Sequence, residues 1–384
     1  MLFSKITLRL KWLIILTISI LLFLFINDVP KISPIEKLVI HHKYNLVLWE
    51  LNNFPQKWLF KIKQFFSYDT DSIDTQIYVL CDYFQNDSDS DGQNYSEEIL
   101  ESVVTSVLIK EGFTIWGDFV FPPVDTKLGG APNLLVISPR DSIKRIEEIL
   151  LNPAISLSTV EYFENTLLLD QNLSAIVIEL GGIATYPSSI AEMETLRDIL
   201  TTVSHEWVHH YLFFYPLGQS IYQDSQMTTL NESIAVILGN EIGRQVWDEI
   251  NQNDRCIPID KYKDQDKEVM INDSFNFNMV MRETREKVEK YLQDGEIQNA
   301  ENYMNNQRDL FVRNGYQIRK INQAYFSFYG TYANRPESTS LTYEHLLEIR
   351  NRMSSLYEFL DILKDISSYE EFLAIHRQLT NNNE

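Results

Sequence analysis

Positive charge is scarce in this chain. Its 384 residues include 33 lysines and arginines against 54 aspartates and glutamates, which gives a formal net charge of −21. A surface this acidic repels the phosphate backbone of DNA and RNA, so nucleic acid is excluded as an expected partner. The charge does not by itself identify a substrate.

Cysteine is nearly absent. The two cysteines, Cys81 and Cys256, lie far apart in the sequence and match no metal-ligand spacing. A cysteine-based metal site is therefore not expected, and the pattern leaves open whether the two residues are bridged.

A long uncharged apolar run occurs only at the amino terminus. Lys5, Arg9 and Lys11 precede WLIILTISILLFLFI (residues 12–26), and Asp28 follows it. Fifteen helical residues span about 22 Å, slightly less than a hydrocarbon core, and no small-x-small cleavage site follows. We expect an uncleaved signal anchor with the lipid bilayer as a partner. The flanking charges predict a single-pass protein of the cell membrane, with its amino terminus in the cytoplasm and its body outside.

The remaining sequence changes character near residue 190. The residue types at 75–84 (TQIYVLCDYF) are those of a strand or of the start of a helix. Residues 132–143 (PNLLVISPRDSI) suit a strand followed by a turn, and residues 173–189 (LSAIVIELGGIATYPSS) are rich in β-forming residues. Helical patterns dominate from Ile190 to the end. The sequence predicts an α+β fold: residues 1–30 as a cytoplasmic tip and anchor helix, residues 31–190 as a mixed α/β half, and residues 191–384 as a mainly helical half.

The helical half opens with a histidine cluster. SSIAEMETLRDILTTVSHEWVHHYLFFY (residues 188–215) is expected to be one helix, started by a capping box and stopped by a proline. Residues four apart share a helix face, so His205 and His209 can bind one zinc ion, with Glu206 beside them to take a proton from the attacking water. Chance predicts only about 0.02 such HExxH matches in a chain of this composition. His210 lies about 100° further round the helix and is assigned a packing or surface role.

A catalytic zinc site needs a third protein ligand. The extended metzincin pattern would place glycine and histidine where the chain has Leu212 and Tyr215, so that pattern is excluded. Glu232, which follows His209 by 23 residues, is the preferred third ligand, because Pro216 and Gly218 can turn the chain back between them.

Three alternatives to this ligand stay open. Thr229 and Glu232 also have the spacing of a capping box, in which Glu232 would bond only its own backbone. Asp224 in the connecting loop and Glu241 on the second helix are rival ligands. Glu241 lies about 180° round the helix from Glu232, so these two cannot both face the metal.

These segments resemble a known family. HEWVHHYLFF followed by TLNESIAVILGNEIG is similar to the gluzincin metallopeptidases, whose second helix brings an Asn-Glu-x-x-Ala segment to the zinc. Asn231, Glu232 and Ala235 match that segment. A closer likeness is to a bacterial group of predicted aminopeptidases, carried also by APNLLVISPRDSI, MRETREKVEKYLQDGEIQNAENYMNNQR and INQAYFSFYGTYA. Together the similar stretches cover most of residues 75–384.

The resemblance implies a zincin-like arrangement, with strands before the active-site helix. It also implies that His205, His209 and Glu232 bind one zinc ion and that Glu206 is the general base and acid of a peptidase. The label aminopeptidase is an analogy and adds little to this assignment.

Supporting residues are less well defined by the sequence. A donor must meet the charge that develops on the carbonyl oxygen, and NQAYFSFYGTYANR offers Tyr325, Tyr329, Tyr332 and Arg335. Tyr325 and Tyr329 are selected as catalytic candidates, although the three tyrosines share the spacing of a helical core stripe. Asp198, seven residues before His205, is predicted to orient the histidines.

The β-rich segment before the histidine helix is a candidate substrate edge. Gly181 and Gly182 would let an extended substrate backbone approach closely. An ordinary bulge or turn explains the two glycines equally well.

A second possible metal site is a calcium loop. DSDSDGQNYSEE (residues 87–98) fits the EF-hand loop pattern with Asp87, Asp89, Asp91 and Glu98 as oxygen ligands. Asn94 replaces the usual apolar residue at the eighth position. A solvated acidic loop is the simpler interpretation.

The leading hypothesis is a membrane-anchored, extracytoplasmic zinc metallopeptidase that acts on peptides or unfolded protein segments. The alternatives are a non-catalytic, zinc-stabilised, membrane-tethered binding or adaptor protein, and a hydrolase of a non-peptide amide or ester. The sequence does not distinguish cleavage at a chain end from internal cleavage.

Overall fold

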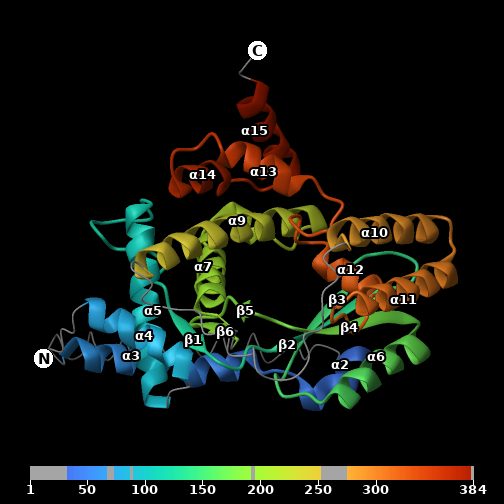
Figure 1. Cartoon of the computed structure of the whole chain (residues 1–384), viewed down its shortest axis with the longest axis horizontal. Coiled ribbons are helices and arrows are strands. Elements are labelled where there is room, and N and C mark those ends of the chain that lie inside the picture. Colours follow the sequence, from blue (N-terminus) through green and yellow to red (C-terminus); the bar gives the residue numbers. More distant parts are fainter. Residues whose placement is uncertain (1–32, 67–72, 87–89, 192–194, 252–274, 382–384) are drawn as a thin grey trace, which may run out of the picture. The chain divides into compact units, whose positions relative to one another are not determined.

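The computed structural model describes residues 33–66, 73–86, 90–191, 195–251 and 275–381. The chain divides into two compact units, Met1–His41 and His42–Glu384. In the first unit, the described residues form helix α2 (Pro34–Val39), which Ser33 starts with a capping box. Figure 1 shows the elements of both units along the chain.

The expected mixed α/β half is helical in its first part, and of the two alternatives for residues 75–84 the helix is observed. Helices α3 (Leu46–Phe66), α4 (Ile73–Asn86) and α5 (Ser90–Lys110) precede the first strand. The segment 75–84 belongs to α4, where Ile77, Leu80 and Cys81 are buried while Tyr78 is exposed. That spacing has the period of a helix and not of a strand. Cys256 lies outside the described residues.

The expected anchor helix is the part of the fold class that has to be corrected. In the ranges that the structure describes, no helix is long and apolar enough to cross a membrane. The run at residues 12–26, where the anchor was placed, lies outside those ranges. The fold class that the structure supports is therefore a mixed helix-and-sheet fold without a membrane-spanning helix among the described residues.

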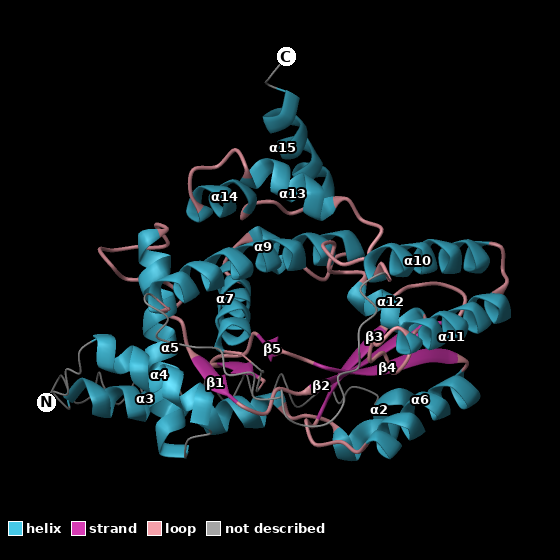
Figure 2. Cartoon of the chain, viewed as in Figure 1, coloured by secondary structure: helices cyan, strands magenta, loops and turns pink. Residues whose placement is uncertain are grey.

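The strands form two small sheets, drawn in Figure 2. The first has the order β3-β2-β4, with β2 (Asn133–Pro139) antiparallel to both β3 (Glu147–Leu151) and β4 (Leu173–Glu179). Helix α6 (Leu157–Gln171) connects β3 to β4. The second has the order β1-β6-β5, where β1 (Thr126–Leu128) is parallel to β6 (Ser188–Ile190) and β5 (Gly182–Ile183) is antiparallel to β6. Both β4 and β5 are therefore edge strands.

The rest of the chain is helical, as the sequence predicts. Helix α7 (Leu196–Leu212) leads through the short α8 (Pro216–Gln219) into α9 (Ser225–Ile250). The helices that follow are α10 (Phe277–Gln293), α11 (Ile297–Arg313), α12 (Gln323–Tyr329), α13 (Thr342–Arg350), α14 (Leu356–Leu363) and α15 (Tyr369–Asn381).

Two hydrophobic clusters hold these elements together. The first joins α4, α5, α7 and α9 with the three last helices, through side chains such as Leu200, Leu238 and Phe359. The second joins the inner face of β2 and β4 with α10, α11 and α12, through side chains such as Ile176 and Phe326. The two clusters place α7, α9 and α12 in fixed positions relative to their neighbours.

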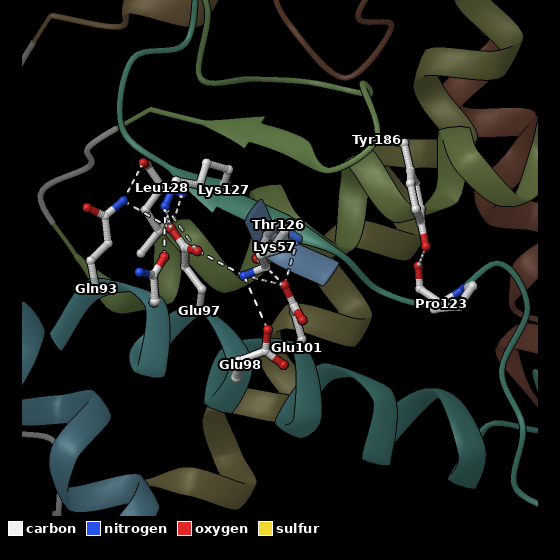
Figure 3. Close-up of polar contacts among 11 residues, drawn as sticks. Lys57, Gln93, Glu97, Glu98, Glu101, Pro123, Thr126, Lys127, Leu128 and Tyr186 are labelled. Carbon is white, nitrogen blue, oxygen red and sulfur yellow. Dashed lines mark hydrogen bonds and ion pairs between the residues drawn. The ribbon is translucent and has the colours of Figure 1, made fainter. Parts of the chain in front are cut away.

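A buried lysine stabilises the outer edge of β1 (Figure 3). The carboxylates of Glu97 and Glu101 on α5 accept the backbone N–H groups of Leu128 at 2.9 Å and Thr126 at 2.8 Å. Lys57 on α3 lies 2.8 Å from Glu97 and 3.0 Å from Glu101. Burial alone would lower the pKa of Lys57, but the carboxylates of Glu101 and Glu97 raise it above its usual value. The edge is thus capped by carboxylates whose charge Lys57 offsets.

Replacing Lys57 by methionine is expected to destabilise the fold strongly. The variant removes the buried cation between Glu97 and Glu101 and leaves Glu97 with Lys127 at 3.2 Å, and breaking a buried ion pair typically costs about 3–5 kcal/mol. Lys110→Met is the control, because Lys110 pairs with Glu249 at the surface and is 60% exposed. We expect the control to change the free energy of unfolding by less than about 1 kcal/mol. Urea unfolding of the three proteins checks this, and equal destabilisation by both variants would contradict it.

Candidate metal centre

Helix α7 carries the histidine cluster but starts later than the sequence predicts. Ser188–Ile190 form strand β6, and α7 begins at Leu196 after the cap residue Thr195. Thr195 Oγ1 accepts the backbone N–H of Asp198 at 3.1 Å and donates to its carboxylate at 2.7 Å. Asp198 is exposed and its carboxylate binds the N-cap Thr195, so no described contact supports the prediction that it orients the histidines.

Helix α9 carries Glu232, and its geometry decides among the alternatives for the third ligand. Asp224 is the N-cap of α9 and accepts two backbone N–H groups of the first turn. Thr229 lies inside the helix, so the alternative in which it caps the helix together with Glu232 is excluded. Glu241 forms two hydrogen bonds with Arg350 on α13, at 3.0 and 2.9 Å. Both rival ligands thus have other partners.

The two histidines and Glu232 converge as a metal site requires. The Nε2 atoms of His205 and His209 are 3.1 Å apart, and they lie 3.5 and 3.7 Å from the two carboxylate oxygens of Glu232. A tetrahedral zinc ion with bonds of about 2.0–2.1 Å would separate its ligand atoms by roughly 3.3 Å. Within the described ranges, this is the group of three metal-ligating side chains close enough to hold one ion.

An unsatisfied oxygen supports the same assignment. Glu232 Oε2 is buried and has no hydrogen-bond partner among the described residues. A buried carboxylate oxygen without a partner is costly, and a cation at this position would remove the cost. The residues present therefore fit a divalent metal ion.

The electrostatics favour the ligand forms of two of the three side chains. Burial lowers the pKa of His209 to about 4, although Glu232 opposes this. Burial would raise the pKa of Glu232, but His209 and His205 lower it to about 2. Burial lowers the pKa of His205, yet the carboxylate of Glu232, 3.5 Å from its Nε2 atom, raises it above the usual value overall. A metal ion that binds here therefore competes with a proton for His205.

Two glycines bring α9 close enough to α7 for this geometry. A Cβ at Gly239 would lie 2.9 Å from His205 Cβ, and one at Gly243 would lie 2.7 Å from Thr201 Cα. A larger side chain at position 239 would therefore push His205 away from Glu232. Sequence reasoning missed this pair, although their spacing of one helical turn is a visible signal.

Glu206 lies beside the metal ligands in a buried position. It is 6% exposed, and burial raises its pKa to about 7. A Cβ at Gly182 on β5 would lie 2.7 Å from Glu206 Oε1 and 2.9 Å from Thr202 Cγ2, so a larger residue there would displace the Glu206 carboxylate. The predicted edge strand thus lies against Glu206, and Gly182 is explained by that carboxylate. The adjacent Gly181 accepts the backbone N–H of Ala191 through its carbonyl at 2.8 Å.

His210 is outside the metal group, as the sequence predicts. Its Nε2 atom donates to the carbonyl oxygen of Thr185 at 2.7 Å, and its ring contacts that of Tyr186. Burial lowers the pKa of His210 to about 4, which keeps the ring neutral. Its role is to tie α7 to the segment before β6.

The tyrosines selected from the sequence have other partners. Tyr325 donates to the buried carboxylate of Glu337 at 2.7 Å, and Tyr329 stacks under the guanidinium of Arg335 at 4.6 Å. Burial raises the pKa of Tyr332 well above its usual value, and Glu232 and Glu206 raise it further. The charges of Glu232 and Glu206 therefore act on Tyr332, which lies in the turn after α12.

Arg145 is a functional candidate that sequence reasoning missed. Its Nη2 atom donates to the carbonyl oxygen of Ser327 at 3.3 Å and to Thr331 Oγ1 at 3.2 Å. Its charge also lowers the pKa of Glu232. Arg145 thus fixes the segment before Tyr332 and adds positive charge near the third ligand. It lies in a loop far from the other site residues in sequence, so no local pattern indicates it.

The predicted calcium loop is helical over the part that the structure describes. Helix α5 begins at Ser90, so residues 90–98 do not form the turn that a calcium loop requires. Glu98 lies on this helix, 3.6 Å from Lys57. Asp87, Asp89 and the side chain of Asp91 lie outside what the structure describes, and calcium binding stays a prediction without support here.

Comparisons with protein-family models, with curated proteins and with solved structures find no match. The gluzincin resemblance therefore stays a prediction, and function has to be inferred from the site itself.

Proposed function

We propose that the protein is a zinc-dependent metallopeptidase of gluzincin type. The observation that carries this proposal is the buried group of His205, His209 and Glu232 with the carboxylate of Glu206 beside it. Two imidazoles and one carboxylate are a typical ligand set of catalytic zinc, which keeps one position open. A purely structural zinc site would not need a fourth, buried carboxylate next to its ligands.

The bound zinc ion would supply a Lewis acid for the scissile carbonyl group. Glu206 takes a proton from the water molecule that attacks the carbonyl carbon. It then gives this proton to the amine nitrogen as the C–N bond breaks, leaving a carboxylate and an amine as products. A pKa of about 7 suits a residue that first accepts and then donates a proton near neutral pH.

Two further elements of the chain support this chemistry. Tyr332, whose raised pKa keeps its hydroxyl protonated, donates a hydrogen bond to the carbonyl oxygen as negative charge develops there. The edge strand β5 lies beside Glu206 and offers backbone groups with which an extended peptide can pair. Together they orient the peptide bond over the metal group.

Removing zinc from the purified protein is expected to abolish cleavage of unfolded protein and peptide substrates. Adding back about one equivalent of zinc should restore it, because three ligands from two helices specify a single ion. Mass spectrometry of the products measures cleavage before and after chelation. A zinc-loaded protein that cleaves no peptide would contradict the proposal and favour the non-catalytic binding protein.

A further inference from the structure

A cavity of about 630 Å³ opens along the free edge of β4. Its walls include Ile176 and Ile178 from β4, the rings of Phe277 and Tyr316, and Tyr329 of α12. Three cationic side chains also line it: Arg319, Lys320 and Arg335.

Two of these cations are already engaged. Arg319 forms two hydrogen bonds with the buried carboxylate of Glu164, at 2.9 and 2.6 Å, and Lys320 binds the same carboxylate at 2.8 Å. Arg319 also donates to the carbonyl oxygen of Val177 at 3.3 Å, which caps part of the β4 edge. These two side chains therefore stabilise the sheet edge and the loop that covers it.

Arg335 is held differently. Its guanidinium stacks on Tyr329 at 4.6 Å, and its Nε atom donates to Glu337 Oε2 at 3.3 Å. Glu337 is fully buried and is fixed in turn by the hydroxyl of Tyr325 at 2.7 Å. The two terminal nitrogens of Arg335 have no hydrogen-bond partner among the described residues, and the side chain is 44% exposed. Tyr329 and Glu337 thus hold the guanidinium in place, and its two terminal nitrogens can donate two parallel hydrogen bonds to the two oxygens of a carboxylate.

The cavity adjoins the metal group along two segments. The backbone N–H of Arg335 donates to the carbonyl oxygen of Tyr332 at 2.9 Å, so the arginine lies in the same turn as the tyrosine whose pKa the charges of Glu232 and Glu206 raise. Glu179 ends β4 at the cavity, and Gly182, three residues later, contacts Glu206. Short stretches of chain therefore connect the cavity lining at Arg335 and Glu179 to Tyr332 and Gly182, the two residues next to the metal group.

We propose that Arg335 binds a carboxylate of the peptide substrate in this cavity, and that this contact selects substrates with a negative group near the scissile bond. The inference rests on the proposed peptidase function. The carboxylate is either the free carboxyl terminus or an acidic side chain, and both offer the same two oxygens. Because the net charge of −21 repels acidic peptides at long range, selection must come from such a local, hydrogen-bonded contact.

The test uses one peptide sequence in matched forms: carboxyl terminus free or amidated, and one internal residue glutamate or glutamine. For the full-length protein we expect kcat/KM for the preferred acid form to exceed that for its neutral partner by at least about tenfold. Arg335→Gln should reduce this ratio to less than about twofold. Arg308→Gln removes the same charge from an exposed pair with Asp309 and should keep the ratio. The pair of peptides that shows the preference identifies the source of the carboxylate.

Arg335→Gln leaves the carboxylate of Glu337 buried without its cation and can destabilise the fold. The second variant therefore combines Arg335→Gln with Glu337→Gln, and it should lose the preference for the acid form in the same way. If the wild-type protein cleaves acid and neutral forms equally, the Arg335 assignment is wrong while the peptidase function stands. If no peptide is cleaved, the proposed function fails. The affinity of the protein for labelled peptides then tests whether Arg335 binds a carboxylate. Tighter binding of the acid form that is lost in Arg335→Gln supports the carboxylate site, and equal binding overturns it.

Discussion

Replacing Glu206 by glutamine is expected to abolish peptide cleavage and to leave zinc bound. Glutamine has nearly the same shape but cannot take a proton from the attacking water, and loss of a general base typically lowers kcat by about 10²–10⁴-fold. His205, His209 and Glu232 are unchanged in this variant, so zinc should stay at about one ion per chain. Kinetics on a fluorogenic peptide and elemental analysis of the same sample measure both quantities.

The matched control for this variant is Glu241→Gln. Glu241 is a glutamate of α9 that is paired with Arg350 and does not belong to the metal group. We expect it to retain wild-type cleavage and zinc content. A Glu206→Gln protein that cleaves peptides at the wild-type rate would refute the role given to Glu206.

Replacing Glu232 by alanine is expected to remove both zinc and cleavage. The change leaves two imidazoles on one turn of α7, without the carboxylate that α9 supplies. Residues that only support metal ligands typically contribute 10–100-fold to metal affinity, and loss of a ligand should cost more than about 100-fold. Competition with a chromogenic chelator measures the affinity, and the cleavage assay on the same protein measures the activity.

Glu241→Ala is the control for this second variant, because it truncates a glutamate of the same helix nine residues later. It should bind zinc like the wild-type protein. If Glu232→Ala binds zinc as tightly as Glu241→Ala, the third ligand lies elsewhere, and the geometry described for α7 and α9 is not that of the metal site.

The ligand pair could be predicted from the sequence because its geometry is local. Residues four apart share a helix face wherever the helix begins, so the later start of α7 does not affect His205 and His209. Glu232 depends on the path of the chain through α8, and the sequence could only rank it above its rivals. The structure favours Glu232, because it lies close to both histidines while Asp224 caps α9 and Glu241 pairs with Arg350.

Contacts between distant segments could not be predicted. Arg145 reaches the turn before Tyr332 from a loop nearly two hundred residues earlier, and the parallel pairing of β1 with β6 joins segments about sixty residues apart. The sequence offered Tyr325, Tyr329 and Tyr332 at the spacing of one helical stripe and could not rank them, because Tyr332 lies beyond the end of α12, where the stripe no longer applies.

The fold was harder to predict than the site for a related reason. The β-branched and aromatic residues at 75–84 are compatible with a strand, and only their burial pattern in α4 shows the helical period. Short strands such as β5 and β6 contain two or three residues each, too few to produce an alternating pattern.

Anomalous diffraction at the zinc absorption edge, recorded from crystals of the wild-type protein, tests the central claim most directly. We expect one strong peak that lies within bonding distance, about 2.0–2.2 Å, of His205 Nε2, His209 Nε2 and a carboxylate oxygen of Glu232. Zinc-supplemented crystals without a peak at these three side chains, or with the peak at other ligands, would contradict the metal centre and the function inferred from it.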